Sequence, residues 1–357
     1  MLTQIFNPDY PVFFGDVAEA LKKFLADTNY SKIFILVDEN TKLHCLPLLN
    51  NLPAIQEASV LSISAGEKHK NIETCQRIWA GLMEQQADRK ALFVNLGGGV
   101  IGDMGGFCAS TFKRGIRFLQ IPTTLLSQVD ASVGGKLGID FMGVKNSIGV
   151  FRNPEAVIID PAFLGTLPPR EVRSGFAEML KHSLIQDKKQ WQILTNVDPF
   201  QPENWRDQIG ASVSIKQKIV EADPLEKGIR KALNFGHTVG HALESYFLEG
   251  STPLLHGEAI AAGMVVEAIL SQQMGLLNVG ELEEIYREIK NIYELPEVRT
   301  TSYSVLLEYM WQDKKNEQQQ INCSLLAGIG GTKIDCLLDE SAIIDSLDRY
   351  RDLISAS

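Results

Sequence analysis

The 357-residue sequence lacks a surplus of positive charge, a long apolar run and paired cysteines. Its 34 lysines and arginines face 44 aspartates and glutamates, a net charge of −10, which argues against nucleic-acid binding through a broad basic surface. No window of ~18 uncharged apolar residues occurs, and the N-terminus lacks the basic and apolar regions of a signal peptide. The five cysteines show no CxxC spacing, which argues against a disulfide framework. These absences predict a soluble cytoplasmic protein, in which any anionic ligand needs a local binding charge.

The order of expected elements indicates two domains. Buried strands are expected at residues 32–39, 91–96, 117–122 and 156–160, with a helix over 72–83. This alternation favours a Rossmann-like parallel α/β sheet. After Pro161, helical patterns dominate, at residues 177–184, 209–220, 237–247, 258–273, 281–289 and 341–350. We therefore expect an α/β domain over residues 1–165 and a mostly α-helical domain over residues 166–357.

A glycine-rich turn, Gly97-Gly98-Gly99, follows the second expected strand, although neither a GxGxxG fingerprint nor a P-loop is present. Such glycines either let backbone N–H groups approach a pyrophosphate or serve close helix–strand packing. Asp38 ends the preceding strand, where a carboxylate binds ribose hydroxyls or caps the next helix. Thr123 and Thr124 follow a third strand. Because ligands of open α/β sheets bind outside the carboxyl ends of strands, these groups predict one nucleotide site.

Histidines and one glutamate form a candidate metal site. His237 and His241 are four residues apart on one face of an expected helix, and His256 begins the next one. Glu178 is a carboxylate in an otherwise apolar helix. A catalytic zinc needs three converging donors and an open position. The spacing is looser than HExxH, and it equally allows His182 as a ligand or a histidine as a plain core residue.

Local positive charge lies beside glycines in this acidic chain. Lys136 follows Gly134-Gly135, and Lys145-Asn146 follow Gly143 by two residues. A point charge beside backbone donors suits phosphate or carboxylate. Lys314-Lys315, by contrast, are typical of a solvated face. The pattern predicts a small polyanion as the ligand.

Six ordered segments resemble the 3-dehydroquinate synthase family: GGGVIGDMGGFCAS, IPTTLLSQVDASVGGKLGID, GVKNSIGVF, GFAEMLKH, LNFGHTVGHALE and HGEAIAAGM. The resemblance covers about residues 30–330. It implies an NAD-binding N-terminal domain, a C-terminal domain that binds zinc or cobalt, and a homodimer. It also implies the second step of the shikimate pathway, which converts 3-deoxy-D-arabino-heptulosonate 7-phosphate to 3-dehydroquinate and phosphate. Transient oxidation by NAD, phosphate elimination, re-reduction and aldol closure make up that reaction.

The resemblance also implies roles for individual residues. The implied metal ligands are Glu178, His237 and His256, and the implied catalytic residues are Lys181, Asp130, His241 and Lys136. The implied NAD contacts are Asp38, Asn40, Glu67, Lys70, Gly98, Gly99, Val100, Asp103, Thr123, Thr124, Leu126, Lys145 and Thr166. The implied substrate contacts are Arg114, Asp130, Lys136, Asn146, Lys181, Lys216, Arg230, Asn234, His241 and Lys315, with Lys314 as an alternative to Lys315. Arg114 is implied to reach the phosphate across the dimer interface.

Three other functions fit parts of the pattern. A different sugar-phosphate cyclase would act on a substrate without a carboxylate, and the resemblance implies that Arg230 and Asn234, both present, discriminate against it. A metal-dependent polyol dehydrogenase would suit Glu178 with His182, but it has no use for the lysines at 136, 145, 181 and 216. A non-catalytic NAD-binding protein would need no converging metal ligands.

Overall fold

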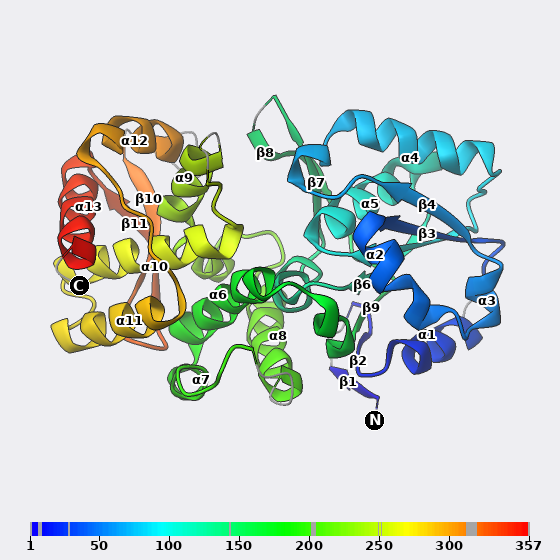
Figure 1. Ribbon diagram of the computed structural model, residues 1–357, viewed down its shortest axis with the longest axis horizontal. Helices are drawn as coiled ribbons and strands as arrows, with labels where there is room; N and C mark the ends of the chain where they lie inside the picture. Colours follow the sequence, from blue (N-terminus) through cyan, green and yellow to red (C-terminus); the bar gives the residue numbers. More distant parts are fainter. Residues whose placement is uncertain are drawn as a thin grey trace. The chain divides into compact units, whose positions relative to one another are not determined.

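The computed structural model describes residues 2–5, 9–27, 29–142, 144–200, 205–248, 250, 252–311 and 320–355. Contacts between Cα atoms divide the chain into two compact units, Met1–Pro168 with Pro202–Ser214 and Pro169–Gln201 with Ile215–Ser357. The sequence placed its boundary near residue 165. An α/β sheet forms the first unit and helices dominate the second, which confirms the predicted fold class (Figure 1).

The first unit contains a seven-stranded sheet of order β1-β2-β9-β6-β5-β3-β4. The strands are β1 (Thr3–Ile5), β2 (Val12–Phe14), β3 (Ile33–Asp38), β4 (Ser59–Ile63), β5 (Leu92–Gly97), β6 (Arg117–Pro122) and β9 (Ala156–Ile159). All neighbours pair in parallel except β1 and β2, which are antiparallel. The four expected strands are β3, β5, β6 and β9. Each is a continuous apolar run because both faces of a parallel sheet are covered.

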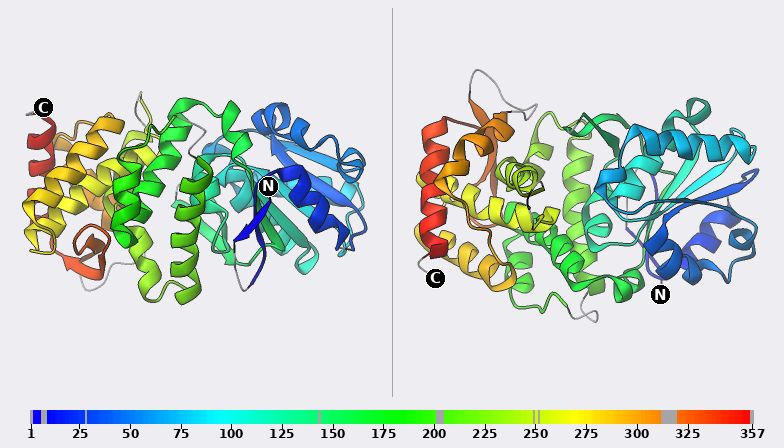
Figure 2. Two further views of the ribbon diagram at one scale, coloured as in Figure 1. Left: turned by 90° about the horizontal axis from the view of Figure 1, so that it is seen from below. Right: turned by 45° about the horizontal axis from the view of Figure 1, so that its top comes forward.

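Helices cover the two faces of this sheet (Figure 2). Along β3, Ile33, Ile35 and Val37 join a core cluster with α1 (Val17–Ala26). The alternate residues of β3 join a second cluster with α4 (Ile72–Glu84) and α5 (Gly99–Thr111). The remaining short elements of this layer are α2 (Glu39–His44), η1 (Leu46–Leu49), α3 (Pro53–Gln56), η2 (Glu67–His69), η3 (Phe112–Arg114), η4 (Ser127–Ala131) and η5 (Pro161–Thr166).

A separate antiparallel hairpin, β7 (Lys136–Phe141) and β8 (Val144–Phe151), packs on α5 in the same unit. The sequence did not predict this hairpin. Gly138 and Gly149 face each other across the two strands, and an ideal Cβ on either would lie 3.2–3.5 Å from the Cα atom of the other. The two glycines interrupt the alternation of apolar and polar residues that marks a strand. The hairpin carries Lys136, Lys145 and Asn146, and Lys136 begins β7 directly after the positive-φ glycines 134 and 135, beside a glycine turn as expected.

In the second unit the helix α10 (His256–Gln273) is buried over nearly its whole length and packs against α6, α9, α11 and α13. The other elements are α6 (Pro169–Gln186), α7 (Lys188–Leu194), η7 (Ile229–Asn234), α9 (His237–Leu248), α11 (Val279–Ile292), η8 (Thr300–Ser302), α12 (Tyr303–Trp311), β10 (Ile321–Leu326), β11 (Thr332–Leu338) and α13 (Glu340–Ser355). Helix α8 (Trp205–Ala222) contributes to both units. Among the described residues, no helix combines the length and apolar character that a membrane span requires.

Glycines let α9 and α10 pack in backbone contact. An ideal Cβ on Gly263 of α10 would lie 2.1 Å from the carbonyl oxygen of Gly236 and 2.7 Å from the backbone nitrogen of Gly240. Gly236 itself has φ +78°, a conformation that side chains disfavour. The first turn of α9, which begins with His237, is thereby held against the second turn of α10, the helix that His256 begins.

Candidate active site

Two helix N-termini and the middle of a third helix bring the predicted metal ligands together. Glu178 is fully buried on α6, His237 begins α9, and His256 begins α10. The Oε1 atom of Glu178 lies 3.5 Å from Nε2 of His237 and 3.6 Å from Nε2 of His256. The carboxylate and both imidazoles therefore converge on one point.

The second nitrogen of each imidazole has a fixed acceptor. Nδ1 of His237 lies 3.1 Å from the carbonyl oxygen of Phe235, and Nδ1 of His256 lies 3.2 Å from Oε2 of Glu244. An oxygen acceptor at one ring nitrogen orients the ring and leaves the other nitrogen available for a metal. In both histidines the available atom is Nε2, the one that faces Glu178.

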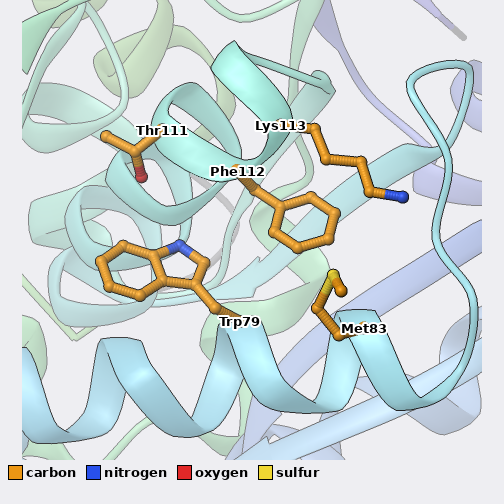
Figure 3. A pocket seen from close by; sticks show the side chains of 5 residues that line it. All are labelled: Trp79, Met83, Thr111, Phe112 and Lys113. Atoms are coloured by element: carbon orange, nitrogen blue, oxygen red, sulfur yellow. The ribbon is translucent and has the colours of Figure 1, made fainter.

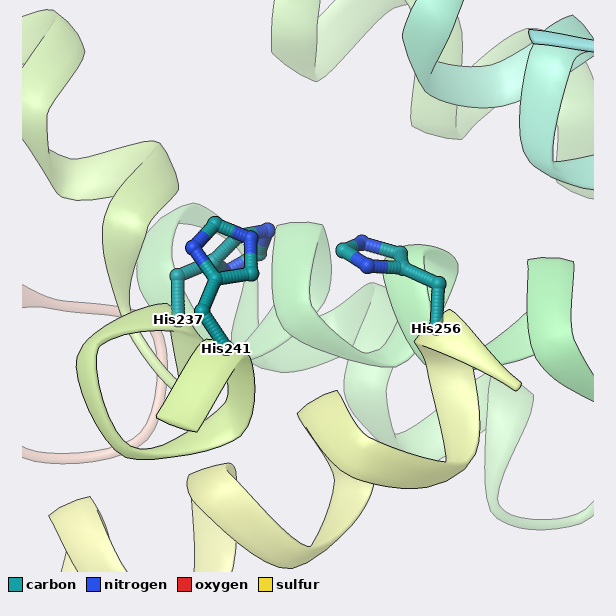
Figure 4. Close-up of side chains that lie close together, drawn as sticks. All are labelled: His237, His241 and His256. Atoms are coloured by element: carbon teal, nitrogen blue, oxygen red, sulfur yellow. The ribbon is translucent and has the colours of Figure 1, made fainter. Parts of the chain in front are cut away.

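His241 offers an alternative third donor. The ligating atoms of His237, His241 and His256 lie within 4.8 Å of one another, and the rings of His241 and His256 are 5.7 Å apart (Figure 4). His241 is exposed, whereas Glu178 is buried. His182 is also buried, one turn along α6 from Glu178. Two sets of three donors therefore share His237 and His256, and they differ in whether Glu178 or His241 is the third.

Buried charges control the protonation of these histidines. Burial, and next the charge of Lys181, lower the pKa of His237 well below its usual range. Burial also opposes the charge on His256, but hydrogen bonds with Glu178 and Glu244 outweigh it and raise its pKa to about 9. The ammonium group of Lys181 forms an ion pair with Oε2 of Glu178. The two carboxylates that contact these histidines belong to Glu178 and Glu244, and their negative charge favours a cation bound by the cluster.

Cations for an anionic ligand are buried in the same unit. The side chains of Lys181, Lys216 and Arg230 are 1%, 6% and 2% exposed. The carboxylate of Asp223 accepts hydrogen bonds from the backbone N–H groups of Gly228 and Arg230, at 2.6 and 3.1 Å, and so orders the loop before η7. The predicted pair Arg230 and Asn234 lies at the ends of the resulting short helix.

In the first unit, the glycine turn joins the carboxyl ends of neighbouring strands. Gly97 ends β5, and Gly98 precedes α5 at its N-cap position. An ideal Cβ on Gly98 would lie 3.0 Å from Cγ2 of Thr124, which follows β6. Burial raises the pKa of the nearby Cys45 thiol to about 11; this thiol also hydrogen-bonds Thr123 and is close enough to feel the charge of Asp38. The structure thus brings together the three groups that predicted a nucleotide site.

The alternative explanations, in which Asp38 caps a helix and the glycines serve helix–strand packing, also hold in part. The Oδ1 atom of Asp38 accepts a hydrogen bond from the backbone N–H of Thr41 at 2.7 Å and caps α2. An ideal Cβ on Gly105 would lie 2.1 Å from the side-chain oxygen of Asn95 in β5, so later glycines of the motif serve helix–strand packing. Capping occupies one carboxylate oxygen of Asp38, and packing also applies within the turn, because an ideal Cβ on Gly97 would lie 2.5 Å from Ile101 of α5.

A second polar group in the first unit surrounds Lys70, which is buried. Its ammonium lies 2.7 Å from Oδ2 of Asp103, 2.6 Å from Oδ1 of Asn146 and 3.7 Å from Oε1 of Glu67. Burial opposes the positive charge, but Asp103 and then Glu67 raise the pKa of Lys70 above its usual range. The structure therefore connects three predicted NAD contacts with Asn146, a predicted substrate contact.

The other predicted residues of this unit lie on separate elements. Four of them are exposed: Arg114 at the end of η3, Lys136 at the start of β7, Asn40 in α2 and Thr166 at the end of η5. Partly buried positions are held by Gly99 and Val100 in α5, Leu126 before η4, Asp130 in η4 and Lys145 in β8. Lys314 and Lys315 fall outside the described residues.

A shallow apolar pocket of about 380 Å³ lies elsewhere in the first unit, between α4 and η3. Its lining residues are Trp79, Met83, Thr111, Phe112 and Lys113 (Figure 3). The ammonium of Lys113, its one charged group, donates a hydrogen bond to the carbonyl oxygen of Ala87. None of the predicted site residues lines this pocket.

Four acidic residues beside the predicted site were missed from the sequence. They are Asp223, Glu226, whose Oε1 accepts a hydrogen bond from Asn234 at 2.8 Å, Glu244 and Glu267. Spacing alone could have found Glu244, because it lies three and seven residues beyond His241 and His237 on one helix face. Glu267 was detectable only as a lone charge in an apolar helix.

Comparison with known proteins identifies both halves of the chain. Residues 60–174 match the family described as 3-dehydroquinate synthase N-terminal, and residues 175–316 match 3-dehydroquinate synthase C-terminal. The chain is 45% identical over 339 residues to the 3-dehydroquinate synthase of Parabacteroides distasonis, which covers 94% of this chain and 96% of that one.

Solved structures share the fold. A 2-epi-5-epi-valiolone synthase from Streptomyces hygroscopicus, with NAD⁺ and Zn²⁺ bound, has a TM-score of 0.86 at 24% identity and covers 99% of each chain. A 2-deoxy-scyllo-inosose synthase complexed with carbaglucose-6-phosphate, NAD⁺ and Co²⁺ has a TM-score of 0.82 at 23% identity, covering 98% of this chain and 100% of that one.

Proposed function

The chain belongs to the 3-dehydroquinate synthase family and is a phosphate-eliminating lyase, and on that premise we propose which of its residues perform the reaction. Glu178, His237 and His256 hold a divalent metal ion, zinc or cobalt. The glycine turn at Gly98 and Gly99 holds NAD, and the buried cations hold the phosphorylated carboxylate substrate. The observation that carries the proposal is the convergence of Glu178 Oε1 with the two Nε2 atoms.

The donor set fits a catalytic metal. One carboxylate and two imidazoles are the ligand types that zinc accepts, and three protein ligands leave a position for substrate oxygens. The acceptors at both Nδ1 atoms fix each ring with Nε2 facing Glu178. We prefer Glu178 to His241 as the third ligand because its Oε1 atom faces both Nε2 atoms, at 3.5 and 3.6 Å, while Lys181 pairs with its other oxygen. When bound, the metal polarises substrate oxygens as a Lewis acid and lowers the pKa of a hydroxyl group.

The glycine turn fits a dinucleotide. Gly98 and Gly99 stand at the N-terminus of α5, where backbone N–H groups and the helix dipole favour a pyrophosphate, and an ideal Cβ on Gly99 meets only Ala131, at 3.6 Å. We assign Asp38 and Asn40 to the ribose of NAD. The other NAD contacts are assigned as the family resemblance implies. When bound, NAD would accept a hydride from a substrate alcohol, and the resulting ketone would make the neighbouring C–H acidic enough for phosphate to leave before the hydride returns.

Four side chains of the second unit have roles of their own. Lys181 neutralises one oxygen of Glu178, and its charge favours loss of a proton from a substrate hydroxyl because it stabilises the alkoxide. Lys216 and Arg230 bind the anionic groups, and their burial strengthens each ion pair because little water screens it. His241 is exposed beside the ligands and is placed to exchange protons with the substrate.

Arg230 favours a carboxylated substrate over a sugar phosphate that lacks a carboxylate. Its guanidinium is buried, and Nη1 donates a hydrogen bond to the carbonyl oxygen of Pro224 at 2.6 Å, which fixes its plane. A planar guanidinium binds a carboxylate through two parallel hydrogen bonds. We therefore propose 3-deoxy-D-arabino-heptulosonate 7-phosphate as the substrate.

We expect the purified protein, with NAD and Zn²⁺ or Co²⁺, to release phosphate from the heptulosonate 7-phosphate without net accumulation of NADH. Omission of NAD is expected to stop phosphate release, because the elimination depends on the transient ketone. Sedoheptulose 7-phosphate serves as the control substrate and should release phosphate at least ~100-fold more slowly, since it has no carboxylate for the Arg230 guanidinium to bind. Sustained NADH formation from glycerol without phosphate release would instead indicate a polyol dehydrogenase.

We further propose that the protein is a homodimer that buries the tip of the β7–β8 hairpin. Phe141, Met142 and Val144 are 44%, 86% and 45% exposed at this tip. Three neighbouring apolar side chains are an unusual surface for a monomer and suit a self-complementary contact. The resemblance adds that Arg114 of one protomer reaches the phosphate bound by its partner.

Phe141→Asp is expected to convert the dimer to a monomer, because it places a charge in the apolar contact. Light scattering after size exclusion would then give a mass near 39.6 kDa instead of twice that value. Leu43→Asp is the matched control, since Leu43 is an exposed leucine, 68% exposed, on α2. A dimer that persists in Phe141→Asp, or a monomeric unmodified protein, would contradict the proposal.

A further inference from the structure

The helix that carries two of the site histidines cannot cap its own N-terminus. Gly236 precedes His237, the first residue of α9, and it has no side chain to accept the free backbone N–H groups. No other residue fits there: φ is +78°, and an ideal Cβ would lie 2.6 Å from Cγ of Met264. The acceptors for this turn must therefore come from another element.

Glu267 of α10 supplies these acceptors. Its side chain is fully buried, its Oε2 accepts a hydrogen bond from the N–H of Gly236 at 2.6 Å, and its Oε1 accepts one from the N–H of Val239 at 3.1 Å. A carboxylate at a helix N-terminus also interacts favourably with the helix dipole. One side chain thus binds both ends of the turn that contains His237.

Glu267 lies on the same face of α10 as His256. The residues His256, Ile260, Gly263 and Glu267 are spaced by four, three and four positions, the spacing of one helix face. Each of them meets α9: His256 through Glu244, Ile260 against Gly240, Gly263 against Gly236, and Glu267 at the first turn. His256 and Glu267 therefore fix α9 from opposite ends of one face, with the glycine contact between them.

We propose that Glu267 is a positioning residue for the metal site. By holding the first turn of α9, it fixes the imidazoles of His237 and His241 relative to His256 on its own helix (Figure 4). Both of these bonds join its carboxylate to backbone N–H groups and not to the three rings, so through them it acts on the imidazoles by way of the backbone. The inference rests on the proposed function insofar as these histidines bind a metal.

The test is the Zn²⁺ affinity of the full-length protein without NAD or substrate. Glu267→Gln replaces one of the two acceptors by an NH₂ group that faces an N–H donor, so the turn shifts. We expect its Zn²⁺ dissociation constant, measured by competition with a fluorescent chelator at fixed pH, to rise about 10- to 100-fold. The visible absorption of the Co²⁺ form should change as well. Glu267→Asp keeps both acceptors on a shorter side chain and should have an intermediate affinity.

Ser271→Ala is the matched control. Ser271 is buried one turn farther along α10, and its hydroxyl accepts a hydrogen bond from the N–H of Leu326 in β10, not from α9. It should lower the melting temperature while Zn²⁺ affinity stays within ~2-fold. An unchanged Zn²⁺ affinity in folded Glu267→Gln would overturn the proposal. If that variant does not fold, an unchanged Zn²⁺ affinity in Glu267→Asp would do so. A loss of Zn²⁺ affinity in Ser271→Ala as large as that in the Glu267 variants would also overturn it. His237→Ala is the reference: an unchanged affinity there would overturn the metal site itself.

Discussion

Replacing His256 by alanine is expected to lower the rate of phosphate release by about 10³-fold or more and to remove bound zinc. The loss has this size because metal polarisation of a reacting oxygen contributes several kcal/mol, and each ~1.4 kcal/mol is a factor of ten in rate. NAD affinity should stay within ~2-fold, since the predicted NAD contacts belong to the other compact unit. Zinc content, NAD titration and phosphate release on the same preparation measure all three effects.

Two histidine variants give this experiment its controls. His44→Ala removes an exposed histidine of α2 and should leave zinc content and rate unchanged. His241→Ala separates the two possible ligand sets: we expect it to keep its zinc and lose activity, because we assign His241 to the substrate. If His241→Ala lost zinc as completely as His256→Ala, the ligand set would contain His241. Loss of folding in His256→Ala would indicate a structural role for that residue.

Gly263→Ala is expected to destabilise the protein by about 3 kcal/mol and to weaken zinc binding. The added methyl group would lie 2.1 Å from the carbonyl oxygen of Gly236 and 2.7 Å from the nitrogen of Gly240, both of them backbone atoms. A side chain can rotate away from such a contact, but a helix has to move, and forced overpacking costs about 1–3 kcal/mol or more. Because α9 carries His237, its displacement moves a ligand. Denaturant unfolding and chelator competition measure the two effects.

Gly210→Ala is the matched control for this substitution. Gly210 lies inside α8, and an ideal Cβ there has no heavy atom within 4 Å. Alanine at an open helical position should stabilise the protein by about 0.5–1 kcal/mol. A loss of stability in Gly263→Ala no larger than ~0.5 kcal/mol would show that α9 and α10 are not held at this distance.

The sequence predicted those parts of the fold in which one periodicity dominates. Strands β3, β5, β6 and β9 are apolar runs because they are buried on both faces. Helix α11 has one apolar face and one charged face, which gives the helical period. The β7–β8 hairpin escaped prediction because glycines interrupt it, and β10–β11 because it lies among helices. Contacts also place Pro202–Ser214 in the first unit, an association between distant parts of the chain that no local pattern reveals.

Spacing found the candidate metal ligands but could not choose among them. His237, His241 and Glu244 follow helix spacing, yet spacing allowed Glu178 to pair with either His182 or His237. The 3.5 Å between Glu178 Oε1 and His237 Nε2 supports the second pair, although ligating atoms of Glu178 and His182 also lie within 4.8 Å of one another. Long-range contacts decide such cases, and Glu267 shows this most clearly, because its partners are 31 and 28 residues away in sequence. Asp38 is a different case: its two explanations, helix cap and ribose contact, are compatible because a carboxylate has two oxygens.

The central claim is that Glu178, His237 and His256 hold the metal, and anomalous diffraction at the zinc edge from crystals of the zinc-loaded protein tests it most directly. If these three residues hold zinc, one anomalous peak lies about 2.0–2.2 Å from a carboxylate oxygen of Glu178 and about 2.0–2.1 Å from Nε2 of both His237 and His256. A peak coordinated by His237, His241 and His256, with the Glu178 carboxylate beyond bonding distance, would contradict it.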